Sequence, residues 1–135
     1  MRHTIIITII SALFASIMTG CKQNNKYAEK LHALAEQINA QPDKKLANGT
    51  ILTKCEYNAG DSVFTYFIKV EDNRFDKIET DSIKASLARR IASPEMKKLR
   101  NTLIKGNVGL RYIYDSESKE ITIVFSPQEL SDSIK

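Results

Sequence analysis

Tryptophan is absent from this chain, and several residue types that mark particular protein classes are scarce. The 135 residues include five glycines, three prolines and two cysteines. This is too little glycine and proline for a collagen-like or proline-rich chain, and two cysteines cannot build a disulfide-dense scaffold. Hydrophobic residues make up 42% and charged residues 27%, which argues against wholesale disorder and against a protein with many membrane spans. The length fits one globular domain.

Sequence signatures of catalysis and of cofactor binding are also missing. The chain has no G-x-S-x-G element, no P-loop and no Rossmann glycine pattern. The clustered cysteines and histidines that zinc sites need do not occur. The acidic stretch at 71–76 lacks the glycine and the distal glutamate of an EF-hand loop. We therefore expect a protein that is not an enzyme, with no catalytic residues, no metal and no cofactor.

The first 21 residues have the pattern of an export signal. Met1-Arg2-His3 is a short basic start, and 4–18 is an apolar run too short to span a membrane. The run ends in Met18-Thr19-Gly20-Cys21, which resembles the lipobox of bacterial lipoproteins, although that family usually has leucine in place of Met18. In that family the signal is removed before the cysteine, whose thiol then carries a diacylglycerol. The alternative is an uncleaved membrane anchor in which Cys21 has no role.

This resemblance implies a membrane anchor and a location. Cys21 is the expected lipidation site, and with fatty acids such as palmitate on its thiol and amine it is attached stably to a bilayer. Lys22, in place of the aspartate associated with inner-membrane retention, favours the outer membrane, with the domain facing the periplasm or the cell surface. An exported protein does not meet the chromosome, so the formal charge of +4 does not predict nucleic-acid binding. Lipidation leaves Cys55 alone, which excludes a disulfide within the mature chain.

Apolar periodicity predicts a small α+β domain after the leader. Tyr27, Leu31, Leu34 and Ile38 recur at helical spacing. Two hairpins of alternating strands follow, with helices between them. The expected segments are a helix ending near 39, strands at 50–57 and 63–70, helices at about 76–91 and 94–105, and strands at 108–114 and 121–125. The expected order is therefore α-β-β-α-α-β-β, an antiparallel sheet of about four strands with helices packed on one face.

Local signals set the expected boundaries. Asp76 and Glu79 fit a capping box at the start of the second helix, and Ser93-Pro94 fits the start of a third. The two helices are consecutive or form one helix bent at Pro94. The expected divisions are a signal peptide at 1–20, a lipidated polar tether at 21–25, the α+β domain at 26–130 and a tail at 131–135.

Strand alternation places Cys55 on an apolar face. Ile51, Thr53, Cys55 and Tyr57 are expected to share that face, where a free cysteine behaves as a small buried hydrophobe. The alternative is an envelope enzyme that uses Cys55 as a nucleophile, which would need His32 within hydrogen-bond reach of the thiol.

A third hypothesis is that the protein carries lipid or another small ligand. Phe64, Tyr66, Ile68 and Leu110 would line its pocket between sheet and helices, although the same residues suit an ordinary core.

The helical middle of the chain is strongly basic. Its positive residues are Lys84, Arg89, Arg90, Lys97, Lys98, Arg100 and Lys105, against Glu95 alone. One interpretation is a solvated face whose charges match the helix dipoles. The other is a surface for an anionic partner, either lipid headgroups or an acidic protein face.

Three tripeptides share one form, an aspartate, a serine and an aliphatic residue. They begin at Asp61, Asp81 and Asp132, and they resemble the acceptor sites of the O-glycosylation system of Bacteroidota. The resemblance makes Ser62, Ser82 and Ser133 candidate O-glycosylation sites.

The expected function is non-catalytic binding. The sequence favours a lipid-anchored envelope protein that acts as an accessory, assembly or inhibitor-like module, with an envelope protein as its partner. Small periplasmic inhibitor and pilotin-like lipoproteins are similar in size and organisation, an analogy that concerns architecture alone.

Overall fold

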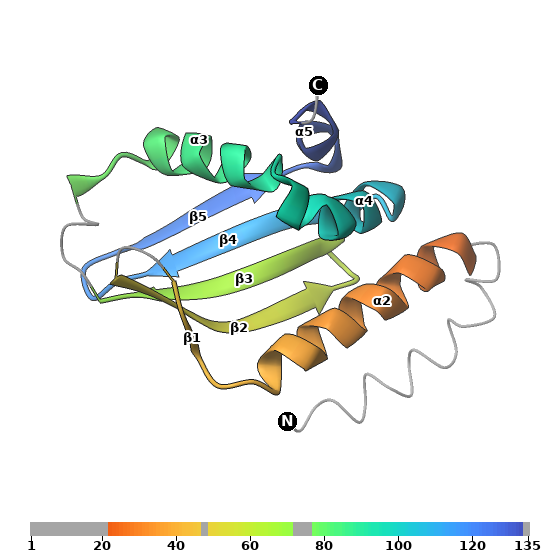
Figure 1. Ribbon diagram of the computed structural model, residues 1–135, viewed down its shortest axis with the longest axis horizontal. Coiled ribbons are helices and arrows are strands. Elements are labelled where there is room, and N and C mark those ends of the chain that lie inside the picture. The colour runs from red at the N-terminus through yellow and green to blue at the C-terminus, as the bar shows by residue number, and fades with distance from the viewer. Residues whose placement is uncertain (1–21, 47–48, 72–76, 134–135) are drawn as a thin grey trace.

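The computed structural model describes residues 22–46, 49–71 and 77–133 (Figure 1). Helix α2 spans Lys22–Asn39, and the short strand β1 spans Lys44–Lys45. The hairpin β2–β3 spans Thr50–Asn58 and Val63–Val70. Helix α3 (Thr80–Ile91), the 3-10 turn η4 (Pro94–Met96) and helix α4 (Lys97–Lys105) lead to the hairpin β4–β5, at Gly109–Asp115 and Glu120–Phe125. Helix α5 (Pro127–Asp132) ends the described part.

The predicted α+β class and the predicted order of helices and hairpins are confirmed. The five strands of the sheet lie in the order β1-β2-β3-β4-β5. The prediction of an antiparallel sheet is wrong at its centre, because β3 and β4 are parallel. Both hairpins are antiparallel as expected, but α3, η4 and α4 together act as one crossover that returns the chain to the end of the sheet where β3 starts. Strand β1 was not predicted, since two lysines give no strand signal.

One bulge in β2 changes which side chains face the helices. Leu52 pairs with Ile68, but Lys54 pairs with Phe67, so one extra residue lies between them. The predicted common face from Ile51 to Cys55 is therefore wrong: Cys55 faces the core together with Leu52, whereas Ile51 pairs with the exposed Lys69. Because side chains alternate with a period of two, a single inserted residue exchanges the two faces.

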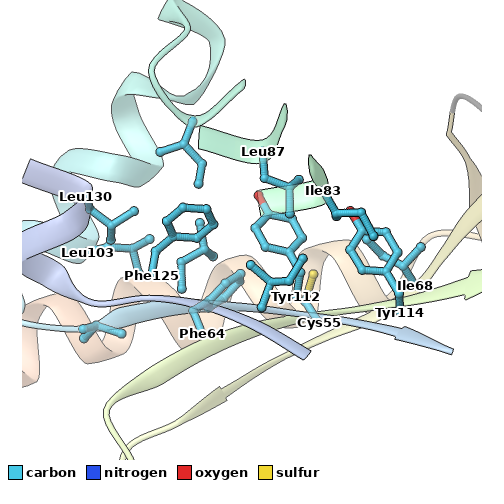
Figure 2. Close-up of a cluster of buried hydrophobic side chains, with 14 of the residues drawn as sticks. Cys55, Phe64, Ile68, Ile83, Leu87, Leu103, Tyr112, Tyr114, Phe125 and Leu130 are labelled. Atoms are coloured by element: carbon cyan, nitrogen blue, oxygen red, sulfur yellow. The ribbon is translucent and has the colours of Figure 1, made fainter. Parts of the chain in front are cut away.

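The core lies between the sheet and one layer of helices. Side chains from α2, α3, α4 and α5 join the same buried cluster as those from β2 to β5. Figure 2 shows Tyr112 and Tyr114 rising from β4 toward Leu87 and Ile83, with Phe125 and Leu130 farther along the cluster. Helices α2, α3, α4 and α5 thus cover one face, as predicted, and the other face of the sheet has no helix over it within the described residues.

The helix ends differ from the sequence prediction in three places. Helix α2 begins at Lys22, so residues 22–25 of the predicted tether at 21–25 are helical, since no proline or glycine interrupts them, and Cys21 lies outside the described residues. Helix α3 has Glu79 as its N-cap residue, and Asp76 of the predicted capping box lies outside the described residues. A complete capping box occurs instead at α5, where Ser126 and Glu129 each accept from the other's backbone N–H.

Candidate binding groove

The Cys55 thiol is enclosed by the core rather than presented at a site. Its residue is 2% exposed, and burial raises the pKa of the thiol to about 12. A cysteine nucleophile needs the opposite, an accessible thiol whose pKa is lowered toward neutrality. The exposed His32 packs its ring edge-on against Tyr57, with the ring centres 4.8 Å apart, whereas Cys55 is buried.

Metal binding finds no support in the described ranges. Within them, no group of three or more His, Cys, Asp or Glu side chains is arranged to hold an ion. What the structure does offer on the helix side of the sheet is an open groove.

The groove lies between α2 on one side and α3, η4 and α4 on the other. It consists of two adjoining hollows of about 740 and 310 Å³, which share Tyr66, Glu95 and Met96. Along α2 the lining runs from Tyr27 to Ile38, a helical rise of about 16 Å. The volume is within the range of ligand-binding clefts.

The walls carry apolar side chains that folding leaves half-buried. Leu34 and Ile38 lie on the α2 wall, and Met96 and Leu99 lie on the opposite wall. On α2, Leu31 and Ala35 are buried in the core, whereas Leu34 and Ile38 pack against it and stay partly exposed. The exposed part of Leu34 and Ile38 is available for a second apolar contact.

Three tyrosines form much of the floor. Tyr66 of β3 stacks on Tyr112 of β4 with ring centres 5.3 Å apart, and Tyr112 stacks on Tyr114 at 6.4 Å. All three line the smaller hollow together with Arg90. Burial raises the pKa of each tyrosine, and the positive charge of the nearby Arg90 acts in the opposite direction. The floor therefore combines aromatic surface with neutral hydroxyl groups.

Cations occur on both walls of the groove. Lys30 and Lys44 belong to the α2 and β1 side, whereas Arg90, Lys98 and Lys105 belong to the α3 and α4 side. Among the described lining residues, Glu95 is the single acid. A ligand with several negative charges would match this pattern.

The predicted basic surface is divided by the fold. Arg90, Lys98 and Lys105 line the groove, and Arg89 and Lys97 are exposed outside its lining. The other two, Arg100 and Lys84, are engaged within the protein.

Arg100 is a buried structural residue, so its place in the predicted surface is wrong. It is 6% exposed, and its Nη1 donates to the carbonyls of Ile91 and Ser93. These carbonyls lie where α3 ends, and a helix end leaves such acceptors without intrahelical partners. Arg100 thus fixes the junction between α3 and η4.

Lys84 also makes contacts within the domain. Its ammonium lies 3.1 Å from the Glu129 carboxylate of α5 and 5.3 Å from the centre of the Phe125 ring. Lys84 therefore links α3 to the C-terminal helix, away from the groove.

The candidate glycosylation sites have different surroundings. Ser62 is exposed at the β2–β3 turn, where its φ is 53°. Ser82 is exposed in the first turn of α3. The Ser133 hydroxyl donates to the Leu130 carbonyl at 2.7 Å, and the Ile134 of its tripeptide lies outside the described residues.

Part of the pocket predicted by the carrier hypothesis belongs to the hydrophobic core. Phe64 and Leu110 are fully buried, whereas Tyr66 and Ile68 line the groove. Lys30, Lys44 and the apolar residues of α2 were not predicted to be binding residues. The apolar stripe of α2 was the sequence signal for one wall of the groove. That stripe does not indicate which helix lies opposite it.

A further hollow of about 380 Å³ lies near the β4–β5 turn. Its charged lining residues are of both signs, with Lys54 and Lys69 beside Asp115, Glu117 and Glu120. This mixture selects no charge class of ligand, so the helix-side groove is the better candidate site.

Comparison with known proteins adds a fold and no family. No family model and no curated protein matches the chain. A solved structure from Pseudomonas aeruginosa, described as a "putative secreted protein", is similar with a TM-score of 0.64 and 11% sequence identity. The match covers 80% of this chain and 96% of that chain. At this identity the likeness concerns the fold alone.

Within 22–46, 49–71 and 77–133, no helix has the length and the apolar character to cross a bilayer.

Proposed function

We propose that this protein is a lipid-anchored envelope lipoprotein that binds a partner without catalysing a reaction, and that the groove between α2 and the α3–α4 side is the contact surface. The groove is the observation that carries the proposal. It gathers half-buried apolar walls, a tyrosine floor and five cations at one place. Such a surface suits recognition, because a partner that covers it removes its exposed apolar area from water.

The anchor rests on the leader. Met18-Thr19-Gly20-Cys21 resembles a lipobox, and acyl chains on Cys21 would hold the domain at the outer membrane, with its folded part in the periplasm. Helix α2 begins at Lys22, and Tyr27 is five residues farther on, about 7 Å of helical rise. The Tyr27 end of the groove would then lie close to the membrane, within reach of other envelope proteins.

The buried thiol argues for binding over catalysis. Cys55 is buried with a raised pKa, and the exposed His32 packs against Tyr57. The groove offers apolar, aromatic and cationic groups for binding, but its described lining residues include neither a cysteine nor a histidine.

The test is cross-linking and recovery of the tagged chain from cells of the producing organism, with Cys21→Ala as the control. Recovery of one envelope protein in near-stoichiometric amount, lost in the control, supports a tethered binding module. Recovery of the same abundant proteins from both samples contradicts it. Membrane fractionation and the intact mass of the mature chain test the lipid on Cys21 separately.

A carrier role is the second candidate, because Tyr66 and Ile68 line a hollow of about 310 Å³. Native mass spectrometry of the delipidated protein decides it. A lipid or small molecule retained at one copy per chain would favour a carrier, and its absence would favour protein recognition.

A further inference from the structure

We propose that the occupant of the groove is an acidic amphipathic segment of a protein partner. This inference rests on the proposed function and deepens it by naming the chemistry of the partner. Apolar side chains of the segment would lie against Leu34, Ile38, Met96 and Leu99, and its carboxylates would face the cations of the two walls.

The dimensions of the groove fit a stretch of polypeptide. The lining extends about 16 Å along α2, which corresponds to about three turns of a helix or five extended residues. An amphipathic segment that lies in an apolar groove between two walls is a recurring mode of peptide recognition.

The distribution of charge distinguishes a peptide from a lipid. Lys30 and Lys105 line the larger hollow, and Lys44 and Arg90 line the smaller one. A lipid with one headgroup has its negative charge at one end and leaves the cations at the other end unmatched. A segment with glutamates or aspartates at intervals meets cations along the whole groove.

The floor supports the same choice. Tyr66 and Tyr112 line the smaller hollow with side chains that carry hydroxyl groups. An acyl chain lying on that floor would give the hydroxyl of the half-buried Tyr66 no acceptor, which is unfavourable. A peptide has backbone carbonyls and carboxylates that accept hydrogen bonds.

The test uses a fluorescent 18-residue peptide with leucines at i, i+3, i+4 and i+7 spacing and glutamates at the other positions. Fluorescence anisotropy reports its binding to the full chain in phosphatidylcholine nanodiscs, with empty nanodiscs as the blank. The second probe has lysine in place of every glutamate. We expect the glutamate peptide to bind, the lysine peptide not to bind, and the affinity to fall as salt is raised.

Two double variants make the comparison specific. R90E/K98E reverses two groove cations, and R89E/K97E reverses their exposed sequence neighbours outside the lining. Both change the net charge equally on the same helices, and circular dichroism checks that both fold. We expect R90E/K98E to weaken the glutamate peptide about tenfold, since two exposed attractions become repulsions, and R89E/K97E to change it less than twofold.

Four results would overturn the inference. Equal loss in the two double variants would mean attraction by bulk charge. Equal binding of the lysine peptide would mean apolar contact without charge recognition. Binding to phosphatidylglycerol vesicles that R90E/K98E abolishes, with no binding of either peptide, would assign the groove to lipid. If the in-cell partner is recovered while the glutamate peptide fails, the proposed function stands and the acidic segment is wrong.

Discussion

The side-chain amide of Asn39 forms a two-way hydrogen-bonded bridge to the backbone of Cys55. Its Nδ2 donates to the Cys55 carbonyl at 2.8 Å, and its Oδ1 accepts from the Cys55 N–H at 2.7 Å. Strand β1 pairs with β2 only at Ile51 and Leu52. At Cys55 the Asn39 side chain, rather than a neighbouring strand, provides the hydrogen-bond partners of this edge of β2. The last residue of α2 thereby fixes the helix that forms one wall of the groove.

Asn39→Ala should lower the free energy of unfolding by about 1–3 kcal/mol, because two backbone groups of β2 lose their partner. Urea unfolding followed by circular dichroism measures this change. Glu36→Ala, an exposed position one turn earlier on α2, is the matched control and should change stability by less than about 0.5 kcal/mol. Equal stability of Asn39→Ala and the wild type would contradict the bridging role.

The Cys55 thiol should resist iodoacetamide at pH 8 in the native protein and react once urea unfolds the chain. The reason is its burial, which also raises its pKa to about 12. Mass spectrometry of the labelled peptide measures both rates in the chain with Cys21→Ala. Rapid labelling of the native protein would favour a reactive thiol and so the enzyme alternative.

Alkaline pH should destabilise the fold, starting near the ordinary thiol pKa of 9.0. Above that pH the unfolded thiol loses its proton while the folded thiol keeps it up to about pH 12, so stability falls as pH rises through this window. The slope from one such group is at most about 1.4 kcal/mol per pH unit. In Cys55→Ala the fall between pH 9 and 10 should be smaller, and an equal fall would exclude the thiol as its cause.

Arg100→Met should destabilise the protein by about 2–3 kcal/mol, because the carbonyls of Ile91 and Ser93 lose a buried charged donor. Lys97→Met, an exposed position on the same helix, is the control and should have little effect. Thermal unfolding measures both variants. A Tm for Arg100→Met equal to that of the wild type would return Arg100 to the class of solvated basic residues.

Ser126→Ala should lower the free energy of unfolding by about 1 kcal/mol, because the α5 capping box is lost. Urea unfolding measures this change, and stability equal to that of the wild type would contradict it.

The pKa of Glu129 is lowered first by the backbone N–H of Ser126 and second by Lys84. The carboxylate therefore contributes stability above its ordinary pKa of 4.5, and this contribution is lost as pH falls through the lowered value. Glu129→Gln should reduce the loss of stability between pH 5 and 3, and an unchanged acid limb would contradict this.

The strands and helices could be predicted from sequence because their apolar spacing is local. The predicted strand at 63–70 coincides with β3, and the stripe Ile83, Leu87, Ile91 is the buried face of α3. The β2 bulge was not predictable, because the residue types around Thr53 do not mark an inserted residue. The parallel pairing of β3 and β4 depends on the direction of the crossover, which no local pattern encodes.

The candidate groove was only partly predictable, since it depends on which helix faces meet. Arg89 and Arg90 are neighbours in sequence, yet only Arg90 lines the groove. Arg100 and Lys98 lie on one helix, but the first is buried and the second is exposed. A count of charges along α3 and α4 cannot separate these roles, because they are set by the rotation of each helix against the sheet.

The most direct test of the account is photo-cross-linking in cells of the producing organism. p-Benzoylphenylalanine is placed at Met96, which lines both hollows of the groove, and separately at Thr122, an exposed residue opposite Ile113 on the uncovered sheet face. We expect one specific protein adduct from Met96, none from Thr122, and loss of the Met96 adduct when R90E/K98E is added. An adduct from Thr122 alone, or a Met96 adduct that R90E/K98E leaves unchanged, would contradict it.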